Sequence, residues 1–170
     1  MNKSKMFELE LLVLNKLKGK VALLISDHEK RNLVSLALDE VLAGDAGEAY
    51  RDVVAQVAHR SNFVENFFSY GVIESLLCDP AVEDIIINSI KPIYVHHAQK
   101  GFVCTQKKFN TRQELDNFIL KLIVFSGRHG YSKIANVELS NLSGRANIID
   151  TPLGPQVTIS KAKVDPFSII

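Results

Sequence analysis

Three cations at turns in the second half of the chain could do chemistry: Arg128, Arg145 and Lys161. Arginine presents a planar fork of donors that matches phosphate oxygens, and a neighbouring glycine lets the backbone approach a ligand closely. Gly127 precedes Arg128, Gly144 precedes Arg145, and Lys161 leaves a strand-like run. These residue types suit phosphate oxygens, but on composition alone the three cations are expected to be ordinary surface charges.

The other reactive side chains fit metal or acid–base chemistry less well. His96 and His97 are adjacent in a strand-like run, so they point to opposite faces and cannot easily bind one metal ion. His129 stands apart from them. An acidic cluster, more typical of a solvated turn than of a general acid and base, consists of Asp79, Glu83 and Asp84.

The sequence also lacks the loop that cradles nucleotide phosphates. Gly19-Lys20 is followed by Val21 instead of Ser or Thr, and Leu14 occupies the place of the earlier glycine. We therefore expect these residues alone not to hydrolyse ATP. Cys78 and Cys104 have no metal-type spacing and are expected to be reduced thiols. The net charge of +1 gives no general attraction to nucleic acid, and no apolar run reaches the roughly 18 residues that span a bilayer.

The elements that must position these side chains begin with helices. Apolar spacing predicts an amphipathic helix over residues 5–18. Ser26 and Glu29 form a capping box for a helix that runs to about Ala43 and ends at Gly44, and a third helix is expected from Asp45 to Gly71. Residues 1–70 are thus predicted to be a helical N-terminal unit.

Residues 71–165 change to an α+β pattern. Asp79-Pro80 ends a short helical turn, and Thr111 with Glu114 starts the most regular helix, which closes at 126–128. Strands are expected near 85–87, 93–95, 101–109, 136–139, 145–149 and 156–161. We expect a small PAS-like α/β sandwich, with a five- to six-stranded, mainly antiparallel sheet and a helix on one face.

An ordered set of motifs runs through this second part. Its members are Tyr70-Gly71, Leu76-Leu77, Asp79-Pro80, Glu83-Asp84-Ile85, Asn88, Ile93-Tyr94-Val95, His97, Ser126-Gly127-Arg128-His129, Gly144-Arg145, Thr158-Ile159-Ser160-Lys161 and Asp165-Pro166-Phe167-Ser168. Their order resembles the N-terminal domain of type II and type IV secretion-system ATPases, in particular the archaeal branch that assembles type IV pili and archaella. The likeness rests on the ordered set and not on any single motif.

The resemblance implies a motor protein that works in the cytoplasm, at the inner face of the membrane. A P-loop ATPase domain that uses ATP and Mg would follow, with residues 166–170 starting the linker to it. Family members form homohexamers, contact an integral-membrane platform protein and do not act on nucleic acid. By the same resemblance, Arg128, Arg145 and Lys161 would reach the ATP phosphates and couple nucleotide state to domain closure.

The chain departs from the family pattern at two positions. Ser160 stands where the family strand carries an arginine before Lys161, and Glu138 replaces the aspartate that precedes the arginine turn.

Two other functions stay open. A small-ligand sensor would need an apolar cavity beneath Phe118 and Leu122. A protein–protein adaptor without a nucleotide role would show an exposed apolar patch formed by Phe7, Leu11 and Leu14.

Overall fold

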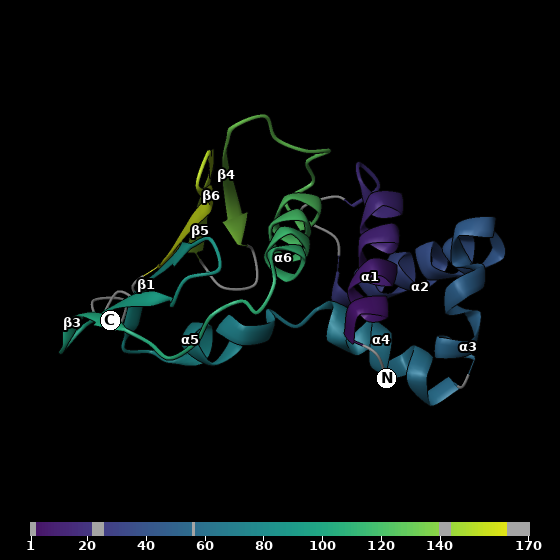
Figure 1. Ribbon diagram of the computed structural model, residues 1–170, viewed down its shortest axis with the longest axis horizontal. Coiled ribbons are helices and arrows are strands. Elements are labelled where there is room, and N and C mark those ends of the chain that lie inside the picture. Colours follow the sequence, from purple (N-terminus) through teal and green to yellow (C-terminus); the bar gives the residue numbers. More distant parts are fainter. Residues whose placement is uncertain (1–2, 22–25, 56, 140–143, 163–170) are drawn as a thin grey trace, which may run out of the picture. The chain divides into compact units, whose positions relative to one another are not determined.

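The computed structural model describes residues 3–21, 26–55, 57–139 and 144–162. Helices and one antiparallel sheet make up these residues, so the α+β class predicted from the sequence is confirmed (Figure 1). Two compact units divide the chain: Met1–Tyr70 with Gln113–Gly130, and Gly71–Arg112 with Tyr131–Ile170. The chain therefore leaves the second unit to contribute one helix to the first, and then returns.

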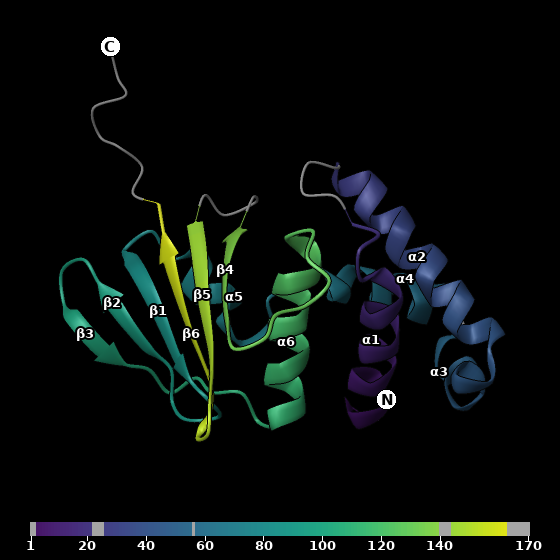
Figure 2. The same ribbon diagram turned by 90° about the horizontal axis from the view of Figure 1, so that it is seen from above.

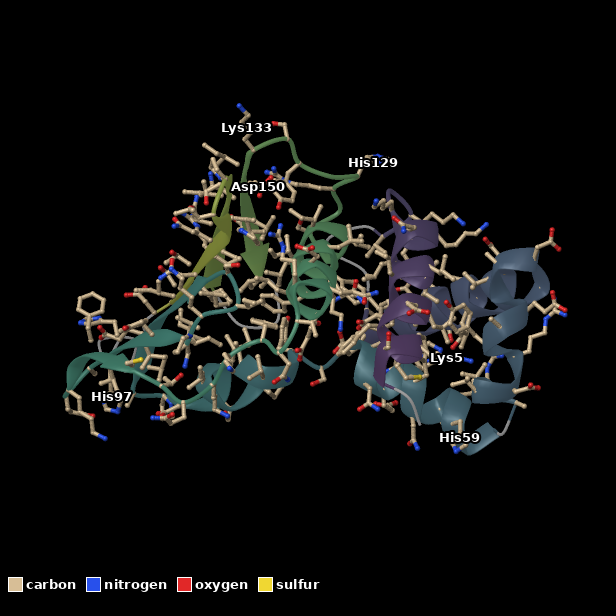
Figure 3. The ribbon with its side chains drawn as sticks, viewed as in Figure 1. Lys5, His59, His97, His129, Lys133 and Asp150 are labelled. Atoms are coloured by element: carbon tan, nitrogen blue, oxygen red, sulfur yellow. The ribbon has the colours of Figure 1, made fainter. Side chains whose placement is uncertain are left out.

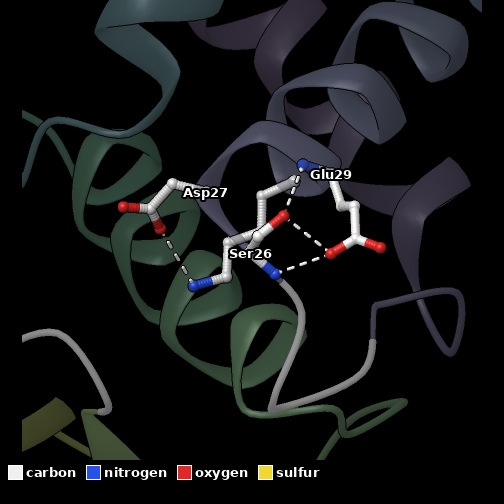
Figure 4. Close-up of polar contacts among 4 residues, drawn as sticks. Ser26, Asp27 and Glu29 are labelled. Carbon is white, nitrogen blue, oxygen red and sulfur yellow. Dashed lines mark hydrogen bonds and ion pairs between the residues drawn. The ribbon is translucent and has the colours of Figure 1, made fainter.

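The first unit is helical. It contains α1 (Lys3–Leu17), α2 (Asp27–Ala43), the 3-10 turn η1 (Asp45–Tyr50), α3 (Arg51–Val54), α4 (Val57–Phe67) and α6 (Arg112–Phe125). The predicted capping box begins α2, because Ser26 Oγ accepts the Glu29 N–H at 3.2 Å and the Ser26 N–H donates to Glu29 Oε2 at 2.8 Å (Figure 4). The Ser26 side chain and backbone donors lower the pKa of Glu29. The helix ends at Ala43, before Gly44, as predicted.

The prediction of a single helix from Asp45 to Gly71 is wrong. The segment is divided into η1, α3 and α4, and α4 ends at Phe67. Gly47 explains the first break, since a Cβ there would lie 2.0 Å from the Val41 carbonyl oxygen. This approach to the end of α2 holds the chain in a tight 3-10 turn, and a regular helix with a larger residue does not fit.

The core of the first unit is apolar and partly aromatic. Its fully or nearly fully buried side chains include Leu9, Val13, Leu14, Leu17, Val34, Leu38, Phe63, Phe67 and Val124. The Phe125 ring of α6 lies 6.2 Å from Phe67 and 5.5 Å from Phe68. Helix α6 thus lies beside α1 in both ribbon views and belongs to this core (Figures 1 and 2).

A buried polar network also joins α6 to α1. Lys121 Nζ lies 2.7 Å from Glu10 Oε1, and both side chains are at most 15% exposed. Asn117 Nδ2 donates to Glu10 Oε2 at 3.0 Å and to the Phe7 carbonyl at 2.8 Å. Lys121 also donates to the Ser69 carbonyl at 3.3 Å. These contacts explain why α6, which the sequence assigned to the second domain, groups with the N-terminal helices.

The second unit is a six-stranded antiparallel sheet preceded by η2 (Gly71–Ile73) and α5 (Glu74–Cys78). Its strands are β1 (Val82–Asn88), β2 (Tyr94–His97), β3 (Gly101–Cys104), β4 (Ile134–Leu139), β5 (Gly144–Thr151) and β6 (Gly154–Lys161). They lie in the order β3-β2-β1-β6-β5-β4 (Figure 2). The expected sheet of five to six mainly antiparallel strands is therefore confirmed.

Strand β3 is shorter than the predicted 101–109. The Ile93 carbonyl accepts the Thr105 N–H at 2.8 Å, but the Ile93 N–H donates to Lys107 O at 2.9 Å, so the ladder becomes irregular after Cys104. The β2–β3 turn ends at Gly101, whose φ of 67° suits a residue without a Cβ.

The sheet has one buried and one open face, because alternate residues of a strand point to opposite sides. The buried face carries Ile85, Ile87, Val95, Val137, Ala146, Ile148, Val157 and Ile159, each at most 3% exposed. On the open face, one row of directly opposed residues crosses all six strands: Phe102, His96, Asp84, Ser160, Arg145 and Glu138. This open face carries the candidate site.

Candidate functional site

Arg145 lies on β5, on the open face of the sheet. It is directly opposite Glu138 of β4 on one side and Ser160 of β6 on the other, and its side chain is exposed. Within the part of the chain that the structure describes, its guanidinium makes no hydrogen bond or ion pair. A fixed strand thus presents an unengaged fork of donors, which is the geometry that phosphate recognition needs.

Gly144 has a structural reason to be glycine. A Cβ there would lie 2.7 Å from the Ser160 carbonyl oxygen and 3.4 Å from Lys161 Cα, on the neighbouring strand. The glycine is therefore required for close pairing of β5 with β6. The Gly-Arg pair, which suggested close approach of a ligand, is explained here by the approach of two strands.

Lys161 faces the other side of the sheet. It pairs with Gly144 and follows Ser160, so its side chain points away from the face that carries Arg145. Its ammonium donates to the carbonyl of Asp79, the residue that ends α5. The same carbonyl accepts the Val82 N–H at 3.2 Å, so the ammonium adds a second donor, and a favourable positive charge, at the C-terminal end of α5. Lys161 thus holds α5 to the end of β6.

A shallow groove of 520 Å³ lies where these strands end. Its lining consists of Glu138, Leu139, Gly144, Arg145, Ser160, Lys161 and Ala162. Two of the three predicted cations therefore border one groove, although their side chains leave opposite faces of the sheet. Arg128 belongs to the first unit, where it is exposed after α6 and its N–H donates to the Ile123 carbonyl at 3.2 Å.

The acidic cluster is divided between two roles. Asp79 Oδ1 accepts the Ala81 N–H at 2.9 Å and so stabilises the turn that follows α5. Glu83 Oε2 lies 3.0 Å from His96 Nδ1, and Asp84 Oδ2 lies 3.7 Å from the same nitrogen. The residues that the structure describes contain no group of three or more His, Cys, Asp or Glu side chains arranged to hold a metal ion.

The histidines lie in different surroundings. His96 stacks on Phe102 with 5.0 Å between ring centroids, whereas His97 Nδ1 accepts the Gln99 N–H at 3.2 Å in the β2–β3 turn. His129 follows α6, and its ring contacts Gly19 so closely that a Cβ on Gly19 would overlap it. Figure 3 labels His97 and His129, which belong to different units.

The sequence did not single out the side chains that crowd the outer strands of the open face. Phe102 is 72% exposed and Tyr94 is 43% exposed, and Tyr94 lies directly opposite Cys104. A hydrogen bond with the Cys104 thiol, and then the charge of that thiol when ionised, raises the pKa of Tyr94. Both cysteines are free and exposed. The partial alternation of residues 101–109 was a signal for a strand, but it did not show that Phe102 would lie uncovered by the described residues.

Comparison with known proteins gives little. No known protein-family profile matches the chain. The uncharacterized protein MJ1288 of Methanocaldococcus jannaschii is 35% identical over 66 residues, which is 38% of this chain and 26% of that protein. The match thus spans about a quarter of the relative's length, and the name of the relative states no activity. No helix among the described residues is both long and apolar enough to cross a membrane.

Proposed function

We propose that this chain is the N-terminal regulatory and assembly domain of a hexameric motor ATPase of the secretion, type IV pilus or archaellum class. The observation that carries the proposal is Arg145, which is exposed on a fixed strand and has no partner among the described residues. The ordered motifs and the six-stranded antiparallel sheet are consistent with it. The helical unit would contact the membrane platform.

In this proposal Arg145 acts on the nucleotide of a following ATPase domain. When the two domains close, the guanidinium would reach the γ-phosphate and stabilise its charge, and the contact would be lost on opening. Lys161 has a supporting role, because its ammonium is engaged by the Asp79 carbonyl. Arg128 stays a predicted phosphate contact. ATP and Mg would be held by the ATPase domain, whose P-loop this chain does not contain.

The exposed apolar patch that a protein–protein adaptor was expected to show is not found among the described residues of α1. Leu14 is completely buried in the core of the first unit, and Phe7 and Leu11 are only partly exposed. The apolar stripe of α1 is thus not an exposed patch for a partner. No observation on the described residues favours a small-ligand sensor over a domain of a motor ATPase.

The test is ATP binding by the complete gene product, wild type against Arg145→Ala. Because one phosphate contact is lost, we expect binding to weaken at least tenfold, about 1.4 kcal/mol. The matched control is Lys133→Ala, an exposed cation that precedes β4 and is labelled in Figure 3. Ser160→Arg restores the arginine of the family strand beside Arg145 and should tighten binding.

Two results would refute the proposal. Equal binding by wild type and Arg145→Ala would make Arg145 a surface charge. A complete reading frame without a P-loop would exclude the motor class altogether.

A further inference from the structure

The outer edge of the sheet at β3 presents backbone groups that can bind another strand. Nothing among the described residues pairs with this edge, because β2 is the only neighbour of β3. The Thr105 N–H bonds the Ile93 carbonyl, so by antiparallel alternation Val103 and Gly101 bond to β2. The N–H and C=O groups of Phe102 and Cys104 therefore point outward.

The same strand exposes a large apolar side chain. Phe102 is 72% exposed, and its ring is supported on one side by the His96 ring, 5.0 Å away. Tyr94 of β2 lies diagonally next to it on the open face and is 43% exposed. The backbone of an added strand could pair with the outward N–H and C=O groups of β3, and its alternate side chains could pack on the Phe102 and Tyr94 rings.

This edge is strongly basic. Between Asn88 and Glu114 the sequence contains no Asp or Glu, and its lysines are Lys91, Lys100, Lys107 and Lys108, whereas Arg112 lies away from this edge, beside Gly154 at the start of β6. Lys100 precedes β3, and Lys107 and Lys108 follow it, so positive charge lies at both ends of the strand. The carboxylates of the adjoining open face, Glu83 and Asp84, belong to β1 and lie against His96.

We propose that the β3 edge binds an extended acidic segment of a partner protein, which adds to the sheet as a seventh strand. A second copy of this chain suits the edge poorly. Each copy would bring Lys100, Lys107 and Lys108 to the shared edge and no Asp or Glu from residues 89–113, and like charges oppose such pairing. An acidic peptide supplies the opposite charge together with N–H and C=O groups at the spacing of a strand, which nucleic acids and lipids lack. The site lies on β3, which β2, β1 and β6 separate from Arg145 on β5.

The test uses a fluorescein-labelled peptide of alternating glutamate and valine, titrated with the chain and followed by fluorescence anisotropy. We expect binding that weakens at least tenfold when lysine replaces glutamate, and that falls between 50 mM and 500 mM NaCl. A version with N-methyl groups on alternate residues keeps the charges but lacks the backbone donors. It should bind at least tenfold more weakly.

Variants of the chain place the peptide on β3. Replacing Lys100, Lys107 and Lys108 with glutamate should weaken binding at least tenfold, and Phe102→Ala at least threefold. The matched control is Lys133→Glu with Ile134→Ala, which alters a lysine and a 59% exposed isoleucine at the opposite edge strand. This control should change binding less than twofold.

Several outcomes would overturn the proposal. They are no binding of the acidic peptide at 1 mM, equal binding of the N-methylated peptide, or an equal effect of the β4 control. Dimerisation that depends on Phe102 would assign the edge to a second copy. Binding of phosphatidylserine vesicles or polyuridine in place of the peptide would assign it to lipid or RNA. The nucleotide test through Arg145 is independent of all these results.

Discussion

Glu10→Ala is expected to destabilise the helical unit strongly. In the folded chain Glu10 neutralises the ammonium of Lys121 at 2.7 Å, and the two side chains are 15% and 10% exposed. Removing the carboxylate leaves a charged lysine in the core, with the Ser69 carbonyl at 3.3 Å and the Phe67 ring at 5.3 Å as its remaining partners. Asn117 would lose one of its two acceptors.

The magnitude follows from this geometry. Breaking a buried pair by removing one partner costs about 3–5 kcal/mol. The Ser69 carbonyl and the Phe67 ring still contact the ammonium, so we expect the lower end, about 3 kcal/mol in the free energy of unfolding. For a chain of this size that corresponds to a fall in Tm of roughly 6–12 °C.

The assay is urea denaturation followed by far-ultraviolet circular dichroism, with the single variants Glu10→Ala, Glu10→Leu and Lys121→Met and the double variant Glu10→Leu/Lys121→Met. Since the double variant removes both charges and keeps most of the volume, it should lie within about 1 kcal/mol of wild type. The matched control is Glu40→Ala. Its pair with Lys20 is 3.4 Å long with both side chains 51% exposed, and its loss should cost less than about 0.5 kcal/mol.

A Glu10→Ala variant that loses no more free energy of unfolding than Glu40→Ala would contradict this prediction. A second contrary result is a loss in free energy of unfolding for the double variant that equals the sum of the losses for the single variants Glu10→Leu and Lys121→Met. Each residue would then stabilise the fold separately, and not through the pair.

Two further predictions concern the same unit. Gly47→Ala should lower the free energy of unfolding in urea by more than about 2 kcal/mol, because its Cβ would meet the Val41 carbonyl at 2.0 Å. The control is Gly130→Ala, whose Cβ would have no atom of the described residues within 4 Å, and equal effects of the two changes would contradict the prediction. Asp39 is held by Arg60 through hydrogen bonds of 2.6 and 2.7 Å, which lower the pKa of Asp39 from 3.8. A lowered carboxyl pKa stabilises the fold above 3.8 and the gain is lost as the pH falls through the folded value. The free energy of unfolding of wild type should therefore exceed that of Asp39→Asn by about 0.5–1 kcal/mol at pH 7, and by less at pH 2.5. The value is that of a surface ion pair, because the Asp39 side chain is 56% exposed. A difference that does not change with pH would contradict this.

Local signals in the sequence predicted the positions of many of the helices and strands. The Ser26–Glu29 capping box and Gly44 located α2, and Asp79-Pro80 located the end of α5. Two β-branched runs, one partly alternating run and the turn residues around three later segments predicted the six strands, although β3 is shorter than expected. These signals depend on residues close in sequence. The prediction of one helix from Asp45 to Gly71 was wrong at its start because the 3-10 turn there depends on the contact of Gly47 with Val41 on another helix.

The candidate site shows the same division. Sequence alone determined that Arg128, Arg145 and Lys161 lie at turns or strand ends and that the segment from Ser89 to Gln113 is without acidic residues. Tertiary structure decided that Arg145 is exposed on the open face and that the Lys161 ammonium donates to the Asp79 carbonyl, because register sets which face a strand residue occupies. It also decided that Lys121 pairs with Glu10, 111 residues earlier in the chain. Such partners are chosen by packing between distant segments, which no local pattern encodes.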